Sequence, residues 1–138
     1  MKRITIFFFL AFLMLACGDG LREEVVATFD NGQASLARVY NRDNQWVREL
    51  YYYESGQLRM EGAIRDGQRD GEWISYFPDG KVQSRGFFEK GKRTGKATIY
   101  HENGNLYIEG YYKDGEKTGL WIYYDEQGYE TSRVDLGE

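Results

Sequence analysis

The sequence predicts an all-β protein, an elongated antiparallel sheet of stacked β-hairpins, preceded by a signal-peptide helix. Glycines recur every 24 residues in several series, which indicates a repeated supersecondary unit. The chain also holds 12 Tyr and 17 Gly but a single Pro among its 138 residues. Because tyrosine favours strands and glycine favours tight turns, this composition predicts hairpins for the repeated part.

The chain begins with the features of a secretory signal. Met1-Lys2-Arg3 is basic, and residues 4–16 (ITIFFFLAFLMLA) are apolar apart from one threonine. This run is shorter than the about 20 residues that a membrane-spanning helix needs, but it has the length of a signal-peptide h-region. We therefore expect a signal peptide over residues 1–16 and a tether over residues 17–24.

The only cysteine of the chain, Cys17, directly follows this apolar run and is flanked by Ala16 and Gly18. The arrangement resembles a bacterial lipobox, although Met14 and Leu15 stand where Leu and a small residue are commonest. The resemblance implies an exported, lipid-anchored membrane protein with its lipid on Cys17. A glycine after the cysteine, in place of aspartate, implies the outer membrane. A cleaved signal without lipid and an uncleaved anchor are the alternatives.

The repeat is defined by four glycine series in one register, with Tyr52, Tyr76, Tyr100 and Tyr124 following the same step. We expect one repeat domain over residues 25–138, with units at about 25–48, 49–72, 73–96, 97–120 and 121–138. The first unit is degenerate, as terminal repeats often are. The glycine series are Gly56, Gly80, Gly104 and Gly128; Gly62, Gly86 and Gly110; Gly67, Gly91 and Gly115; and Gly71, Gly95 and Gly119.

Each unit is expected to contain two strands and two turns. Residues 73–77 form one strand, Asp79-Gly80 is a hairpin-turn dipeptide, and residues 82–88 return. The second turn falls at pairs such as Asp114-Gly115, where glycine permits a positive φ. The glycines at 62, 86 and 110 lie inside strands, which they weaken. We expect each of these three to let an aromatic ring from the next strand lie across the backbone.

The joint between two units, YYKDGEKTGLWIYY (residues 111–124), carries the most specific pattern. It resembles the MORN repeat (membrane occupation and recognition nexus), in which an aromatic residue, Asn/Asp-Gly, a second Gly, Trp and Tyr follow in order. The 24-residue step is similar to the bacterial variant of that repeat, which occurs in exported lipoproteins and in proteins labelled as antitoxin components. The resemblance covers about residues 46–130 and implies a β-hairpin array for protein contact or lipid proximity.

The alternation of strand side chains predicts two unlike faces, one mainly apolar and one with charges between aromatic rings. No amphipathic helix follows the signal, so the sheet either curls on itself or is covered by a partner. Exposed aromatic surface tends to mark an interface, although the tyrosines also fit cross-strand packing. The candidate binding surface comprises Tyr52, Trp73, Tyr76, Phe87, Tyr100, Tyr107, Tyr111, Trp121 and Tyr124.

No residue pattern indicates catalysis, a metal or a cofactor. His101, the only histidine, stands where other units have Tyr53, Phe77 and Asp125, which indicates a substitution that the repeat tolerates. Aspartates in turns are expected for backbone hydrogen bonding. The glycine turns lack the following helix that a P-loop or a dinucleotide site requires.

Charge argues against nucleic acid as a partner. Without Lys2 and Arg3, which leave with the signal peptide, the chain has 16 basic and 22 acidic side chains. Proteins that bind nucleic acid usually present a basic footprint. The one basic cluster, in residues 90–96 (KGKRTGK), is expected to be a solvated turn, with contact to anionic lipid headgroups as the alternative.

Together these features favour a non-enzymatic, lipid-anchored repeat module that binds another protein of the bacterial cell envelope. An antitoxin or immunity-type binding protein is an alternative, suggested only by the family labels. A module that binds lipid or cell-wall glycan through its mixed face is a second alternative. Open sheet edges also permit pairing between copies, so a homo-oligomer is possible.

Overall fold

The computed structural model describes residues 20–137, which contain strands and no helix. The expected signal-peptide helix and Cys17 lie outside these residues, and β1 begins inside the segment expected to be a tether. No helix in residues 20–137 is long and apolar enough to cross a membrane. The strands are β1 (Arg22–Thr28), β2 (Ala34–Tyr40), β3 (Trp46–Tyr52), β4 (Leu58–Arg65), β5 (Gln68–Tyr76), β6 (Val82–Glu89), β7 (Lys92–Tyr100), β8 (Leu106–Lys113), β9 (Glu116–Tyr124) and β10 (Glu130–Asp135).

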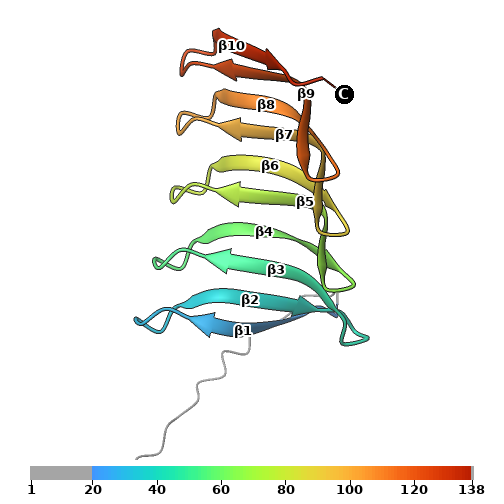
Figure 1. The fold of residues 1–138 in the computed structure, drawn as a ribbon. Coiled ribbons are helices and arrows are strands. Elements are labelled where there is room, and N and C mark those ends of the chain that lie inside the picture. Colours follow the sequence, from blue (N-terminus) through green and yellow to red (C-terminus); the bar gives the residue numbers. More distant parts are fainter. Residues whose placement is uncertain (1–19, 138) are drawn as a thin grey trace, which may run out of the picture.

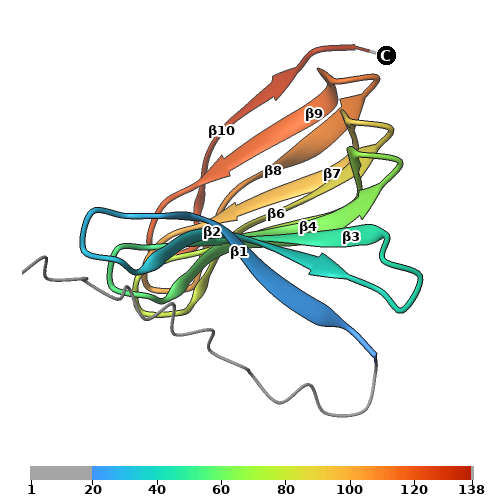
Figure 2. The same ribbon diagram turned by 90° about the horizontal axis from the view of Figure 1, so that it is seen from below.

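All these strands form one 10-stranded antiparallel sheet in which each strand pairs with its neighbours in sequence. Figure 1 shows them stacked like rungs, with β1 and β10 at the two open edges. Figure 2 looks along the stack and shows the strand direction rotating from β1 to β10, the twist expected of a sheet. The predicted all-β array of hairpins is confirmed.

Five alternate turns of the sheet share one geometry, set by the glycines at 32, 56, 80, 104 and 128. In the turn between β5 and β6, the amide of Phe77 donates to the carbonyl of Lys81 at 2.8 Å. The amide of Gly80 donates back to the carbonyl of Phe77 at 2.9 Å. Gly80 has a φ of 86°, a conformation that residues with a Cβ rarely adopt. The same bonds recur in residues 29–33, 53–57, 101–105 and 125–129.

Three of the turns on the opposite side are shorter. Both central residues have positive φ, for example Asp66 at 51° and Gly67 at 74°, as a type I′ hairpin turn requires. Lys90-Gly91 and Asp114-Gly115 adopt the same conformation. In the degenerate first unit, the turn between β2 and β3 is longer and Asn44 supplies the positive φ of 58°.

The sheet bends within β5, β7 and β9. The register against the preceding strand shifts between Gly62 and Ile64, and equivalent shifts recur one and two units later. Gly71, Gly95 and Gly119 lie at these shifts with φ of 73°, 65° and 62°. Figure 1 shows the hairpins β4–β5, β6–β7 and β8–β9 turning away from the rungs on one side. The sheet is therefore bent but not closed.

Cross-strand pairs define two faces of this bent sheet. Side chains from both sides of the bend meet on one face, which we call the inner face, and the opposite one is the outer face. No second layer covers either face within residues 20–137, and the buried apolar residues there are only Ala37, Val39, Ile64, Trp73, Ala97 and Trp121. Rows of paired residues define the inner face as Met60, Ser75, Ser84, Ile99 and Ile108 with Gly62, Trp73, Gly86, Ala97, Gly110 and Trp121, and the outer face as Glu61, Ile74, Arg85, Thr98, Glu109 and Ile122.

Candidate binding site on the inner face

Two tryptophans form the core of the inner face, and each lies flat on a glycine. Trp73 is 4 % exposed and Trp121 is 3 % exposed. A Cβ at Gly62 would stand less than 3.0 Å from the indole of Trp73, and one at Gly110 would stand equally close to Trp121. The expectation that these glycines admit an aromatic ring across the backbone is confirmed at both positions.

The two indoles differ in hydrogen bonding. Trp73 Nε1 donates to the carbonyl of Ala63 at 3.1 Å. The buried Nε1 of Trp121 has no hydrogen-bond partner among residues 20–137. An unpaired buried donor is unfavourable, so Trp121 is held by ring contacts, such as the edge of Tyr112 at 5.2 Å between ring centres, and not by a hydrogen bond.

The same expectation is wrong at Gly86. The residue that would supply the ring is Ala97, so no indole covers this glycine. A Cβ at Gly86 would meet only Arg93 Nη1, at an ordinary contact distance of 3.8 Å. The middle unit therefore keeps the glycine of its neighbours but lacks the ring that packs on it.

A hollow of about 150 Å³ lies where that ring is missing. Trp73 and Trp121 belong to its lining, and so do the small residues Gly86 and Ala97. Met60, Ser84, Phe88, Ile99, Ile108 and Tyr112 also line the hollow, together with charged and polar residues such as Arg69, Arg93 and Lys117. The hollow therefore has a mixed apolar and polar lining and lies at the centre of the inner face.

Three cations border the hollow at the repeat spacing: Arg69, Arg93 and Lys117. The Arg69 guanidinium lies 4.0 Å from the centre of the Trp73 ring, and Lys117 Nζ lies 4.2 Å from that of Trp121. Each of these two cations precedes its tryptophan by four residues. In a straight strand the two side chains would be too far apart to meet, since a strand rises about 3.3 Å per residue. The bends at Gly71 and Gly119 bring them together.

Arg93 occupies the middle position, where there is no tryptophan beneath it. Its guanidinium lies 5.4 Å from the ring centre of Phe88 and 5.2 Å from that of Tyr112. Arg69 also approaches Phe88, at 5.5 Å. Cations and aromatic rings thus alternate along the inner face, and cation–π attraction orders them.

None of these three cations forms an ion pair with a carboxylate of residues 20–137. A buried carboxylate of β3, Glu49, accepts a bond from the Tyr51 hydroxyl at 2.7 Å and lies 3.7 Å from Arg38. Burial and then this bond raise the pKa of Tyr51. Tyr51 also contacts Arg69 and so links it to Glu49, but the three cations bordering the hollow have no direct ion-pair partner in residues 20–137.

The outer face is different because its charges neutralise one another. At equivalent positions of successive units, a carboxylate alternates with a cation, as in Glu61, Arg85 and Glu109. Exposed pairs contribute little stability, about 0–1 kcal/mol each, but they leave no net charge. The pairs are Arg48 with Glu61, Arg85 with Glu72 at 2.9 Å, Lys96 with Glu109 at 2.8 Å and Arg133 with Glu130 at 2.6 Å.

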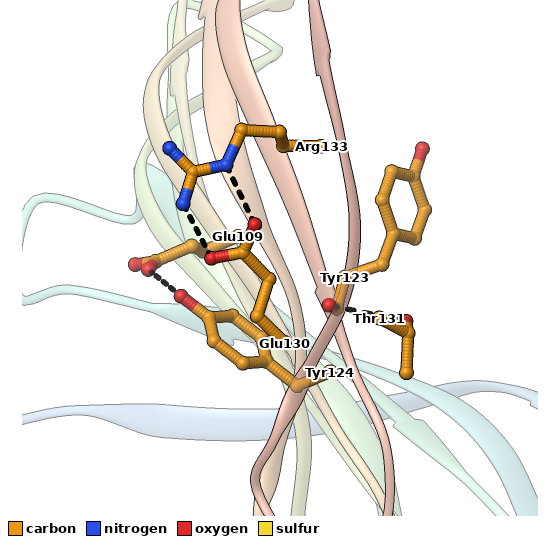
Figure 3. Close-up of polar contacts among 6 residues, drawn as sticks. All are labelled: Glu109, Tyr123, Tyr124, Glu130, Thr131 and Arg133. Carbon is orange, nitrogen blue, oxygen red and sulfur yellow. Dashed lines mark hydrogen bonds and ion pairs between the residues drawn. The ribbon is translucent and has the colours of Figure 1, made fainter.

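Tyrosine hydroxyls extend these pairs. Figure 3 shows Tyr124 donating to Glu109 at 2.8 Å, while the neighbouring Tyr123 points away from it. Hydrogen bonds from Lys96 and then Tyr124 lower the pKa of Glu109. The same carboxylate raises the pKa values of Lys96 and Tyr124. In an earlier unit, Tyr76 donates to Glu61 at 2.7 Å.

Stability at high pH is expected to depend on Tyr76. Burial and then the bond to Glu61 raise the pKa of Tyr76 to about 12, against about 10 in an unfolded chain. The phenol proton therefore stabilises the fold fully below pH about 10, and this contribution is lost as pH rises toward 12. The free energy of unfolding should fall less steeply over this window in Tyr76→Phe than in the parent. Tyr111→Phe is the control, and identical slopes for Tyr76→Phe and the parent would contradict the assignment.

The structure does not bring the nine predicted surface residues together on one face. Trp73 and Trp121 are buried on the inner face. Tyr52, Tyr76, Tyr100 and Tyr124 are half-buried, and the hydroxyl of Tyr52 donates to Glu23 at 3.0 Å. Burial and then that bond raise the pKa of Tyr52. The exposed members are Phe87, Tyr107 and Tyr111, with exposed fractions of 42 %, 41 % and 50 %.

Sequence reasoning missed Arg69 and Lys117, and it placed Arg93 in a basic cluster that was expected to be a solvated turn. Arg69, Arg93 and Lys117 are 24 residues apart and each lies four residues before a tryptophan or Ala97. This periodicity was a usable signal, but the bend that places them over the rings was not evident. The ring of His101 has a structural contact in the repeat, because its Nε2 lies 3.0 Å from the carbonyl of Tyr124, at the position equivalent to the bond from Tyr53 to the carbonyl of Tyr76.

Three segments of the chain, residues 48–63, 69–90 and 93–114, match the family model described as MORN repeat variant. They correspond to the hairpins β3–β4, β5–β6 and β7–β8. The resemblance inferred from the sequence is therefore confirmed for the repeat. No curated protein matches the chain.

Proposed function

We propose that this chain is a non-enzymatic repeat module, anchored by a lipid on Cys17, that binds another protein of the bacterial cell envelope. The observation that carries the proposal is the single layer of the sheet. Domains normally bury the apolar side of a sheet under a second layer, and residues 20–137 supply none. Exposed aromatic side chains such as Phe87 and Tyr111 lie instead on the outer face, and half-buried rings such as Phe88 lie on the inner face, as is typical of an interaction surface.

Two further features support this proposal. Three units match the MORN repeat variant, which favours a repeat module for protein or membrane interaction. The charge of the outer face is neutralised internally, which favours a protein over an anionic lipid surface as the partner of that face.

The lipid anchor is proposed from the sequence of residues 1–18, in which Cys17 follows the apolar run. Metabolic labelling with an alkyne fatty acid tests it. The parent chain should carry the label in the outer-membrane fraction, and Cys17→Ser should carry none. Equal labelling of both chains, or no label on the parent, would contradict the anchor.

Binding to a protein is tested by site-specific photo-crosslinking of the full-length chain in cells. Phe87 and Phe88 are adjacent, and they lie on the outer and inner face respectively, so each is replaced in turn by benzoylphenylalanine. A discrete crosslinked envelope protein from either position is the expected result. If neither position captures a protein while lipid or glycan co-purifies, the proposed function is wrong.

A further inference from the structure

The hollow on the inner face corresponds to one missing ring in a periodic column. The repeat places Trp73 and Trp121 at 48 residues' separation, with Ala97 midway. Gly86 remains under the vacant position although nothing in its surroundings forbids a side chain there. Its φ is not in the left-handed region either, so backbone conformation does not require glycine. The vacancy therefore lies where the repeat would place an aromatic ring.

The size and lining of the hollow fit one aromatic group. The volume of the hollow, about 150 Å³, equals that of a protein cavity that holds benzene. Trp73, Trp121, Phe88 and Tyr112 are all in its lining. Aromatic pairs in offset or edge-to-face contact contribute about 0.5–1.5 kcal/mol beyond the area they bury.

The charge around the hollow indicates an acidic occupant. Arg69, Arg93 and Lys117 lie over aromatic rings and have no carboxylate partner in residues 20–137. The chain as a whole has a formal net charge of −4, so this positive strip is a local feature. Charge complementarity at an interface favours an oppositely charged partner.

The length of the strip indicates a polypeptide as the source of that charge. Successive units are two strands apart, so Arg69 and Lys117 are separated by roughly 20 Å at about 4.8 Å per strand. An extended peptide covers that length with about six residues. A single small aromatic acid fills the hollow but cannot reach all three cations.

We propose that the hollow holds an aromatic side chain of the partner protein, in a segment with acidic residues on both sides of it. The inference rests on the proposed function, since it names the kind of segment that the module binds. The aromatic ring lies on Gly86 between the two tryptophans. The flanking carboxylates pair with the three cations of the inner face.

The test uses the full-length chain in detergent and a synthetic seven-residue peptide with a central tryptophan between acidic residues. Binding is measured by calorimetry. Ala97→Trp fills the hollow with the ring that the repeat dictates, and it should weaken peptide binding about thirtyfold or more, as loss of an interface anchor does. Arg93→Gln, which keeps the hollow open, should weaken binding about tenfold and reduce its dependence on salt.

Phe87→Ala on the outer face is the matched control and should bind the peptide like the parent. Peptides with alanine for tryptophan, or lysine for the acidic residues, should bind far more weakly. Unchanged affinity in both Ala97→Trp and Arg93→Gln would overturn the proposal. If one of them folds poorly, unchanged affinity in the other overturns it. Indole-3-acetate binding as tightly as the peptide would also overturn it, because the site would then take a small molecule.

The two proposals fail in different ways. If photo-crosslinks to a protein arise only from position 87 and the peptide does not bind, the proposed function stands and the inner-face assignment is wrong. If the peptide binds through the hollow but neither position captures a protein in cells, the hollow has the stated preference and the proposed function is wrong.

Discussion

Substitution of Gly62 by alanine is expected to lower the free energy of unfolding by about 1–3 kcal/mol or more, the usual cost of overpacking a core. The added Cβ would stand less than 3.0 Å from the rigid indole of Trp73, so the ring or the backbone must move. Gly110→Ala should have a similar effect through Trp121. Denaturant unfolding of the full-length chain measures both.

Gly86→Ala is the matched control, since it makes the same chemical change in the unit without a ring. Its Cβ would meet only Arg93 Nη1, at 3.8 Å, so the free energy of unfolding should change by less than about 0.5 kcal/mol. The double variant of Gly62→Ala with Trp73→Ala should show strong coupling between the two sites. Equal destabilisation by Gly62→Ala and Gly86→Ala would contradict the proposed packing of indole on glycine.

Trp73→Ala is expected to lower the free energy of unfolding by about 3–5 kcal/mol, because a large buried side chain is lost and a cavity remains. Trp73 also donates a hydrogen bond to the carbonyl of Ala63, which would be left without it. The measured shift is the denaturant midpoint, with the slope m checked for a change in cooperativity. Stacked units contact only their neighbours, so a lower m would indicate that units unfold separately.

Phe87→Ala controls for the loss of an aromatic residue as such. Phe87 is 42 % exposed on the outer face, so its removal should change the free energy of unfolding by less than about 0.5 kcal/mol. Similar losses for Trp73→Ala and Phe87→Ala would show that the inner tryptophan column is not the core.

Much of the fold follows from residues that repeat. Turn glycines such as Gly80 and Gly104 fixed the hairpins, because few other residues adopt their positive φ. Strand alternation predicted that Trp73 and Ile74 would face opposite sides, and the register agrees. Whether the sheet curls depended on Gly71 and its equivalents, and their place inside strands was not expected.

The candidate site was harder to predict because it depends on an exception to the repeat. The repeat alignment shows Ala97 between Trp73 and Trp121, but the consequence of this substitution appears only when Gly86 is seen without a ring. Aromatic content alone grouped Trp73 with Tyr111, although one is buried on the inner face and the other is exposed on the outer face. Composition gives no information about which face a charge reaches, so Arg93 and Lys96 were read as one cluster.

The inner-face site is tested most directly by an intermolecular NOE measurement on the parent chain with the acidic tryptophan peptide. Contacts are expected from the peptide indole protons to the methyl groups of Ala97 and Ile99, and they should be lost in Ala97→Trp. Contacts from the indole only to Phe87 or Tyr111 on the outer face, or no contacts at all, would contradict the inner-face assignment.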